Sequence, residues 1–380
     1  MSSSSRRFHH KSRAGCTTCK AKKVKCDEKQ PCSYCAKRQL PCSLVPASLP
    51  GSACRSESGT PEVVVRFYEE PSFTFADFGL FQHFIKSTSI AQADDSASIA
   101  VWRETIPDLA TQHPYLLHEV LAVAALHVRS TNPEQAKILE RIATEHQARA
   151  IPLFREALAA SSAETALPLF ACSCLFVPYH FAAAKDAISL LFNEESGSLA
   201  EWLVLIHGTA AVTMEHGATI MRSPLRALLG NLANPKPEEL SEGPTDARLL
   251  GLREKLPIAE ERKEAYDQIM YKLRLSYYLS DRADTALNRK NAALRFPPFM
   301  NHGQIGEDLA ARHPAPLILM AFWCVLLHRV EDRWWLKERV KPLLMKIEEL
   351  VPQEYRHLIT WPMEEVGVYP KGNIDVLVIR

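Results

Sequence analysis

Apolar residues recur with helical spacing along most of the chain. Residues 113–130, HPYLLHEVLAVAALHVRS, carry a long apolar face that opens at Pro114, a residue favoured in the first turn of a helix. Within residues 133–160 a second face repeats every four positions, at Ile138, Ile142, His146 and Ala150. Pro152 then predicts that one helix stops and another begins. Residues 316–351 are strongly apolar in their first half and amphipathic in their second.

Strand-like alternation of apolar and polar residues does not extend over any useful length. Residues 233–251, ANPKPEELSEGPTDARLLG, are polar and contain prolines, which predicts a long loop between two helical groups. The acidic stretch 61–78, PEVVVRFYEEPSFTFADF, is expected to open the helical region. Residues 67–380 are therefore predicted to form one large all-α regulatory domain.

The first 45 residues have a different character. They hold six cysteines in two copies of the spacing C-x2-C-x6-C, separated by five residues. The copies, CTTCKAKKVKC and CSYCAKRQLPC, predict two similar halves of one metal site. The predicted ligands are Cys16, Cys19, Cys26, Cys32, Cys35 and Cys42. Cys54 follows them and is predicted to be an unpaired surface thiol.

Six thiolates cannot fill two separate tetrahedral zinc shells. A structural zinc takes four ligands, so one zinc would leave two sulfurs over, and two zincs require two sulfurs that bridge both metals. From the symmetry of the repeat we expect Cys16 and Cys32 to bridge. The expected cofactor is two Zn²⁺ per chain, and the cluster should supply most of the folding energy of so short a segment.

The compartment matters for this interpretation, because oxidised cysteines would form disulfides instead. The start of the chain, MSSSSRRFHHKSR, lacks the apolar core of a secretory signal, and no run of about 18 apolar residues predicts a membrane span. We therefore expect a soluble, intracellular protein with no membrane partner, whose clustered thiols stay reduced and bind metal.

Positive charge is concentrated beside the cysteines. Residues 1–45 carry a net charge of +9 and the rest of the chain −8, so the total of +1 hides the asymmetry. This favours double-stranded DNA as the partner of the small module. Lys22 and Lys23, expected at the exposed middle of a short helix, would reach base edges in the major groove. Phosphate contacts are expected from Lys20, Lys25, Lys11 and Arg13. A basic face that only balances the −2 charge of a zinc cluster is the alternative.

The segment Cys16–Cys42, with KSRAGC at its start and KCDE inside it, resembles the DNA-binding domain of the fungal binuclear zinc cluster (Zn2Cys6) transcription factors. The resemblance implies a small module of two short helices around two zincs, with Cys16 and Cys32 as bridges. It also implies that Lys22 and Lys23 read a CGG-type triplet, that Pro31 turns the loop between the halves, and that the protein regulates RNA polymerase II genes in the nucleus.

The helical region resembles the regulatory region of the sterol-uptake-regulator-like branch of the same family. The likeness is carried by residues 101–127, VWRETIPDLATQHPYLLHEVLAVAALH, by 321–336, AFWCVLLHRVEDRWWL, and by 361–367, WPMEEVG. Members of that branch either bind a sterol in this region or govern secondary-metabolite gene clusters. The resemblance thus implies that sterol or secondary-metabolite genes are the targets.

These signals divide the chain into four parts. Residues 1–14 are expected to form a disordered basic arm, 15–45 the Zn2Cys6 module, 46–66 a Ser-, Pro- and Gly-rich linker, and 67–380 the regulatory domain. The linker shows no heptad repeat, so a homodimer would have to form through the helical domain. Self-association, an apolar ligand and coregulator proteins stay open as the ways in which that domain acts.

Other residues that could carry chemistry have simpler interpretations. Cys172 and Cys174 are flanked by apolar residues and lack a second pair, so we expect them in the core. The histidines in apolar stretches, namely His127, His207, His216 and His328, are expected to be satisfied core or surface residues rather than metal ligands. The aromatic residues Phe322, Trp323, Trp334 and Trp335 are expected in the core, and their alternative role is to line an apolar pocket. No motif for a nucleophile, phosphate loop or open metal site was found, so an enzyme is not expected. The alternative function is a zinc-dependent interaction or corepressor protein with weak DNA contact.

Overall fold

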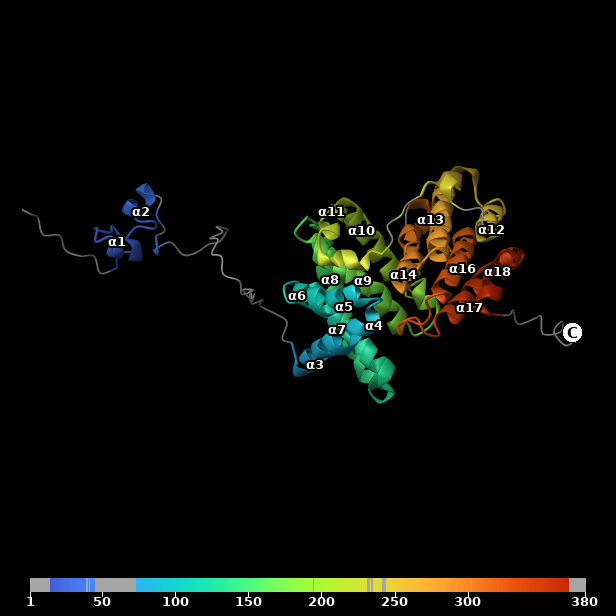
Figure 1. Ribbon diagram of the computed structural model, residues 1–380, viewed down its shortest axis with the longest axis horizontal. Coiled ribbons are helices and arrows are strands. Elements are labelled where there is room, and N and C mark those ends of the chain that lie inside the picture. The colour runs from blue at the N-terminus through green and yellow to red at the C-terminus, as the bar shows by residue number, and fades with distance from the viewer. Residues whose placement is uncertain are drawn as a thin grey trace, which may run out of the picture. The chain divides into compact units, whose positions relative to one another are not determined.

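The computed structural model describes residues 14–44, except 39 and 41, and residues 73–368, except 194, 231, 232, 234, 241–243 and 302. By its internal contacts the chain divides into two compact units, Met1–Val65 and Arg66–Arg380 (Figure 1). Residues 1–13 of the expected basic arm, which include Lys11 and Arg13, and the whole linker 46–66, which includes Cys54, lie outside the described residues.

The first unit contains two five-residue helices, α1 (Thr17–Ala21) and α2 (Ser33–Lys37). Each begins directly after a cysteine that caps it. Five of the six cysteines are buried, and Tyr34, Leu40 and Leu44 pack against them. Few apolar side chains take part, so the sulfur cluster is the core of this unit.

The second unit opens with two longer helices, each interrupted by one π-helical turn. The first comprises α3 (Phe75–His83), a π turn (Phe84–Thr88) and α4 (Ser89–Gln92). The second comprises α5 (Ser96–Ala100), a π turn (Val101–Thr105) and α6 (Ile106–Ala110). Both begin with a capping box, Thr74 with Asp77 and Asp95 with Ser98, which satisfies the free N–H groups of the first turn.

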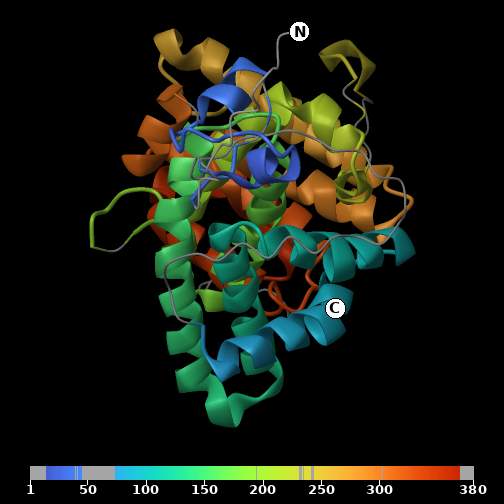
Figure 2. The same ribbon diagram turned by 90° about the vertical axis from the view of Figure 1, so that its left-hand side faces the viewer.

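A long helical hairpin follows, made of α7 (Pro114–Thr131) and α8 (Ala136–Ala159), and its tip projects from the unit (Figures 1 and 2). Pro114 occupies the first turn of α7, as predicted. The prediction for Pro152 was wrong, because α8 continues through it. Ile151 and Phe154, on either side of this proline, are both buried. Their packing favours a continuous helix despite the hydrogen bond that proline cannot make.

The hairpin packs against α9 (Ala166–Ala183), which is followed by α10 (Glu201–Glu215) and α11 (Gly217–Met221). Among the described residues, α9 is the one helix that by itself is long and apolar enough to span a membrane, and 72% of it is buried within the unit. The helices α15 (Gly303–Ala310) and α16 (Pro314–His328) reach that length only together, bent by 95°. The extent of burial of α9 is typical of a core helix.

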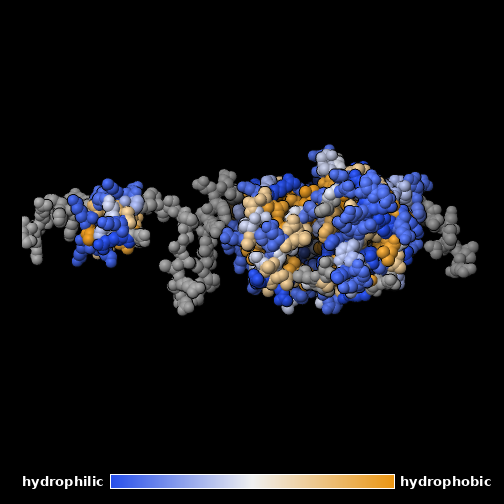
Figure 3. All heavy atoms as spheres, turned by 90° about the horizontal axis from the view of Figure 1, so that it is seen from above, coloured by the Kyte–Doolittle hydropathy of each residue, from blue (hydrophilic) through white to orange (hydrophobic). Residues whose placement is uncertain are grey.

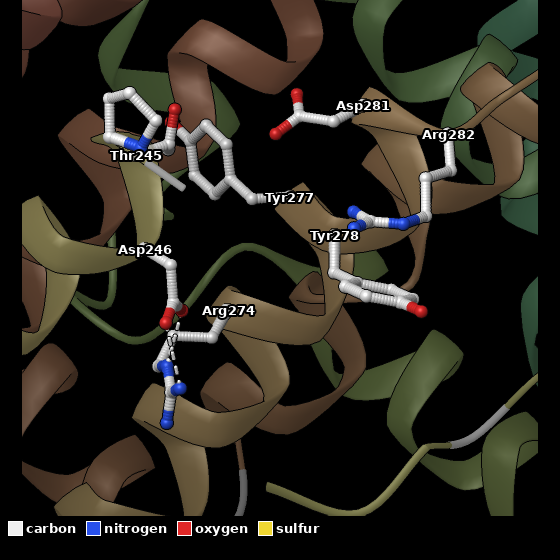
Figure 4. Close-up of a pocket in the computed structure, with 8 residues that line it drawn as sticks. Thr245, Asp246, Arg274, Tyr277, Tyr278, Asp281 and Arg282 are labelled. Atoms are coloured by element: carbon white, nitrogen blue, oxygen red, sulfur yellow. Dashed lines mark hydrogen bonds and ion pairs between the residues drawn. The ribbon is translucent and has the colours of Figure 1, made fainter. Parts of the chain in front are cut away.

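The segment predicted as a loop is partly helical. The helix α12 (Pro244–Arg253) begins inside it, so the sequence TDARLLG belongs to a helix rather than to a connection. Leu249 and Leu252 are buried, and Asp246 forms a two-bond ion pair with Arg274 at 2.6 and 2.9 Å. Figure 4 shows this pair beside Tyr277, at the edge of a water-sized cavity of about 60 Å³. The loop prediction missed α12 because these contacts come from α13 (Lys263–Asp281), which lies outside the predicted loop in the sequence.

The remaining helices include α16, which is buried on all sides and which the others pack around. In order they are α13 (Lys263–Asp281), α14 (Ala286–Leu294), α15 (Gly303–Ala310), α16 (Pro314–His328), α17 (Val340–Leu350) and α18 (Thr360–Val366). Thirteen consecutive residues of α16, from Ala315 to Leu327, are buried. Over the described ranges the unit contains no strand, with a single isolated bridge between Phe192 and Leu199. The predicted all-α fold is confirmed.

Candidate zinc cluster and nucleic-acid interface

The two halves of the cysteine repeat fold in the same way. Cys16 caps α1 and Cys32 caps α2, and their sulfurs accept hydrogen bonds from the N–H groups of Cys19, at 3.3 Å, and Cys35, at 3.5 Å. The third cysteine of each half returns to the first. The Cys16 N–H donates to Cys26 Sγ and the Cys32 N–H to Cys42 Sγ, both at 3.4 Å. The internal repeat in the sequence is therefore a repeat in the structure.

The six sulfurs form two groups of four that share two members. One group holds Cys16, Cys19, Cys26 and Cys32, and the other holds Cys16, Cys32, Cys35 and Cys42, with all ligand atoms of a group within 4.8 Å of one another. The shared sulfurs, of Cys16 and Cys32, lie 3.8 Å apart. Among the described residues these are the two groups able to hold a metal ion.

The spacing of the sulfurs fits tetrahedral zinc. With Zn–S bonds of about 2.3 Å, two ligands of one zinc should lie about 3.8 Å apart. The separations between Sγ atoms are 3.6 Å for Cys16 and Cys35 and 3.6 Å for Cys19 and Cys32. Thiolate sulfur is also the ligand type that structural zinc sites use. The donor set therefore suits two zinc ions that share two thiolates.

The electrostatics of the cluster show why it needs cations. Burial and the neighbouring Cys16 and Cys32 thiols raise the pKa of Cys19 well above its usual range. The N–H of Cys32, by contrast, lowers the pKa of Cys42 to about 7, and the N–H of Cys16 lowers the pKa of Cys26. Closely packed sulfurs can all be thiolates only when a positive ion lies between them.

The helix α1 ends earlier than the sequence analysis expected. Lys22 is its C-cap, and Lys23 follows in the left-handed conformation with φ of 54°. The N–H groups of Lys23 and Val24 donate to the carbonyls of Lys20 and Cys19, which is a Schellman motif. Lys22 and Lys23 thus lie at the C-terminal end of α1 rather than at its middle. The motif turns the chain so that Cys26 reaches Cys16.

The lysines nevertheless form one exposed basic surface. Lys20, Lys22, Lys23 and Lys25 are all exposed. No described carboxylate forms an ion pair with Lys22, Lys23 or Lys25. Asp27, in the same loop, is engaged by Ser33, whose N–H and hydroxyl donate to its two oxygens at 3.0 and 2.5 Å. These bonds fix the loop between the halves, and the sequence analysis did not foresee them, although Asp and Ser are common residues at such junctions.

Of the other residues considered in the sequence, the cysteines and aromatic residues pack in or against the core of the helical unit, whereas His207, His216 and His328 are only partly buried. Cys172 is fully buried and Cys174 packs against the core, as predicted. Trp323 and Trp335 are buried around Phe181, with ring centroids 6.3 and 5.9 Å from it. His207 Nδ1 lies 2.9 Å from the Pro298 carbonyl, 91 residues along the chain, and His328 Nδ1 lies 2.7 Å from a carboxylate oxygen of Glu331.

Comparison with known proteins agrees with this geometry. Residues 14–51 match the fungal Zn(2)-Cys(6) binuclear cluster domain, and residues 79–227 match the fungal specific transcription factor domain. A Zn(2)-C6 fungal-type transcription factor of Gibberella zeae is 26% identical over 94% of this chain and 86% of that protein. The transcription factor afumD of Aspergillus fumigatus is 29% identical over 54% of each chain. Sterol uptake control protein 2 of Candida albicans is 52% identical over 112 residues, which are 30% of this chain and 15% of that protein.

These relatives belong to a non-enzymatic class, which confirms the expectation that the chain is not an enzyme. The cluster domain implies two zinc ions, and the shared sulfurs of Cys16 and Cys32 are arranged to receive them. The chain is therefore a fungal-type Zn2Cys6 transcription factor, with a DNA-binding binuclear zinc cluster domain ahead of a helical fungal-specific transcription factor domain.

Proposed function

We propose that the protein is a nuclear regulator of RNA polymerase II genes that reads a CGG-type triplet in the major groove. Cys16 and Cys32 bridge two zincs, each of which has two further ligands, Cys19 with Cys26 and Cys35 with Cys42. Residues 15–45 form the reading module, 46–66 the linker and 67–380 the regulatory domain. One observation supports the proposal above others: the two groups of four sulfurs that share a pair lie directly beside an exposed surface of lysines.

The base-reading residues are Lys22 and Lys23, at the end of α1. The helix is short and its C-terminal end is the most basic part of the unit, so insertion of this end brings two ammonium groups to the base edges. Lys20 and Lys25 flank them and contact phosphates, together with Lys11 and Arg13. Phosphate contacts carry no sequence information, whereas contacts to guanine O6 and N7 do.

The test is a site selection followed by binding measurements with single variants of the full chain. Lys22→Ala and Lys23→Ala should each cost about 1 to 3 kcal/mol on the selected site and reduce the discrimination among triplets. Alanine at position 23 retains a Cβ in the left-handed conformation, so the change removes the charge and leaves the backbone requirement unaltered. Lys11→Ala is the control, and should weaken all sequences alike and lower the salt slope by about one.

If Lys22→Ala and Lys23→Ala weaken all sequences as Lys11→Ala does, the reading surface is misassigned. In an electrophoretic mobility-shift assay, nonspecific competitor DNA should not remove the band of the full chain bound to the selected site. Loss of that band would instead favour a zinc-dependent interaction or corepressor protein.

For the helical domain, we propose that it controls the factor through self-association, an apolar ligand or coregulator proteins. It holds most of the apolar residues, and the sequence of the linker shows no heptad repeat through which the chain could dimerise. The relative named sterol uptake control protein 2 makes sterol genes one candidate target set, and the resemblance of the helical region to its branch of the family makes secondary-metabolite gene clusters the other. Light scattering on the full chain, with and without DNA, distinguishes self-association from the other two routes.

A further inference from the structure

A cleft of about 750 Å³ opens on the helical unit between α10 and α13. One wall is a stripe of α10 with helical spacing, formed by His207, Ala210, Ala211 and Met214. The rest of the lining includes Pro298 and Phe299, from a 3-10 turn, and Gly303, Gln304 and Ile305, from the start of α15. Its volume lies within the range of small-molecule sites, about 300 to 1,000 Å³. The space-filling view shows apolar side chains at the surface of this unit with hollows between them (Figure 3).

The α10 wall is unusual for a surface helix. Met214 is 84% exposed and Val204, on the same side of the helix, is 42% exposed, although α10 is one of the more apolar helices of the unit. Small side chains at Ala210 and Ala211 leave room beside Met214. An exposed apolar stripe bordering a cavity of this size is typical of a site for an apolar molecule.

The opposite wall adds a charge pattern. The α13 side of the cleft carries Glu264 near its start and Lys272 two turns further on, about 12 Å away along the helix axis. Glu261 lies beside Glu264, and both carboxylates are exposed. The cleft is therefore acidic at one end and basic at the other.

Lys272 lacks a carboxylate partner among the described residues. Its ammonium group is partly buried and lies 4.8 Å from the ring centroid of Phe299 and 5.2 Å from that of Tyr271. Burial and the positive charge of Arg295 lower the pKa of Lys272, so its local environment favours an added negative charge. A neutral apolar molecule would displace water from this ammonium without replacing its hydrogen bonds, which is unfavourable.

We propose that the cleft between α10 and α13 binds a long-chain carboxylic acid, with the carboxylate on Lys272 and the apolar chain along Ala211 and Met214. Glu261 and Glu264 repel the carboxylate from the other end, so they set the orientation. A long-chain carboxylic acid is thus the ligand class for the helical domain. The biological meaning of this binding rests on the controlling role proposed above for that domain. Binding itself requires neither DNA nor zinc.

The test uses the full chain without DNA and the fluorescent fatty acid cis-parinaric acid as the probe. Lys272→Met removes the charge and retains the length of the side chain, and should weaken binding about 10-fold or more. Lys272→Arg should stay within a few-fold of the parent. Ala211→Trp fills the cleft from an exposed position and should abolish binding. Lys185→Met, at a lysine side chain 83% exposed outside the cleft, is the matched control and should leave binding unchanged.

Competition distinguishes the chemical classes. Palmitic acid should displace the probe at least 10-fold better than hexadecanol, which has the same chain and no carboxylate, and better than ergosterol. The proposal is overturned if hexadecanol or ergosterol competes equally well, if the probe does not saturate, or if Lys272→Met and Ala211→Trp bind like the parent. A mobility-shift assay with the same protein preparations measures DNA binding independently of ligand binding. The proposed DNA recognition and the proposed ligand site can therefore fail separately.

Discussion

At the scale of single residues, each cysteine has a position that decides how many metals it serves. Cys16 and Cys32 are helix caps and belong to both groups of sulfurs, whereas Cys19, Cys26, Cys35 and Cys42 each belong to one. Removal of a shared sulfur therefore affects both groups, and removal of an unshared one leaves the other group complete. This difference separates bridged from independent zinc sites.

Cys16→Ser and Cys32→Ser should each abolish the binding of both zincs and unfold the small unit, because metal binding supplies its folding energy. Cys26→Ser should retain one zinc, held by Cys16, Cys32, Cys35 and Cys42. Native mass spectrometry counts the metals, with two expected for the parent. A parent with one zinc, or equal losses in all three variants, would contradict the bridged arrangement.

At the scale of elements, α7 presents buried polar groups to its neighbours. His118 Nδ1 lies 2.9 Å from His146 Nδ1 of α8, and His146 Nε2 lies 3.0 Å from Asp77 of α3. Further along α7, His127 Nδ1 lies 2.9 Å from the hydroxyl of Thr88 and 3.2 Å from His83. These contacts align three helices, but they place imidazole rings where water cannot solvate a charge.

Burial lowers the pKa of both His118 and His127 to about 4, and the adjacent His146 and His83 act in the same direction. An unfolded histidine has a pKa of about 6.5, so between pH 6.5 and pH 4 the unfolded chain binds protons that the folded chain does not. The free energy of unfolding should therefore fall as the pH drops, by about 2 kcal/mol per histidine between pH 7.5 and pH 5.

Urea unfolding of the full chain at several pH values, followed by circular dichroism, measures this slope. His127→Gln should flatten it, and His357→Gln, at an exposed position, is the control that should leave it unchanged. A slope that is the same in the parent and in His127→Gln would show that His127 does not titrate in this range.

At the scale of the whole helical unit, a buried ion cluster connects segments far apart in the chain. The Asp94 carboxylate, whose side chain is fully buried, contacts Lys290 Nζ at 2.5 Å and the guanidinium of Arg333. These residues come from the turn after α4, from α14 and from the turn after α16. Among the described residues Lys290 has no other carboxylate partner, and the other carboxylate near Arg333 is the exposed Asp332, 3.9 Å away. Loss of Asp94 would therefore leave Lys290 without a partner and Arg333 with a weak, solvent-exposed one.

Asp94→Asn should lower the free energy of unfolding by about 3 to 5 kcal/mol, as expected when one partner of a buried ion pair is removed. Asp332→Asn is the control, because Asp332 lies next to Arg333 but its side chain is 81% exposed. Thermal unfolding of both variants gives the comparison. Equal melting temperatures for Asp94→Asn and the parent would mean that the cluster contributes no net stability.

The sequence by itself determined the cluster of six cysteines, the basic module and the all-α body. Ligand spacing and helical periodicity are local properties, because residues within one turn or one short loop meet wherever the rest of the chain lies. Tertiary structure decided that α8 continues through Pro152, that α12 replaces a loop, and that Asp94 meets Lys290 and Arg333. These outcomes depend on packing between segments that are up to 239 residues apart, and local pattern carries no information on such contacts.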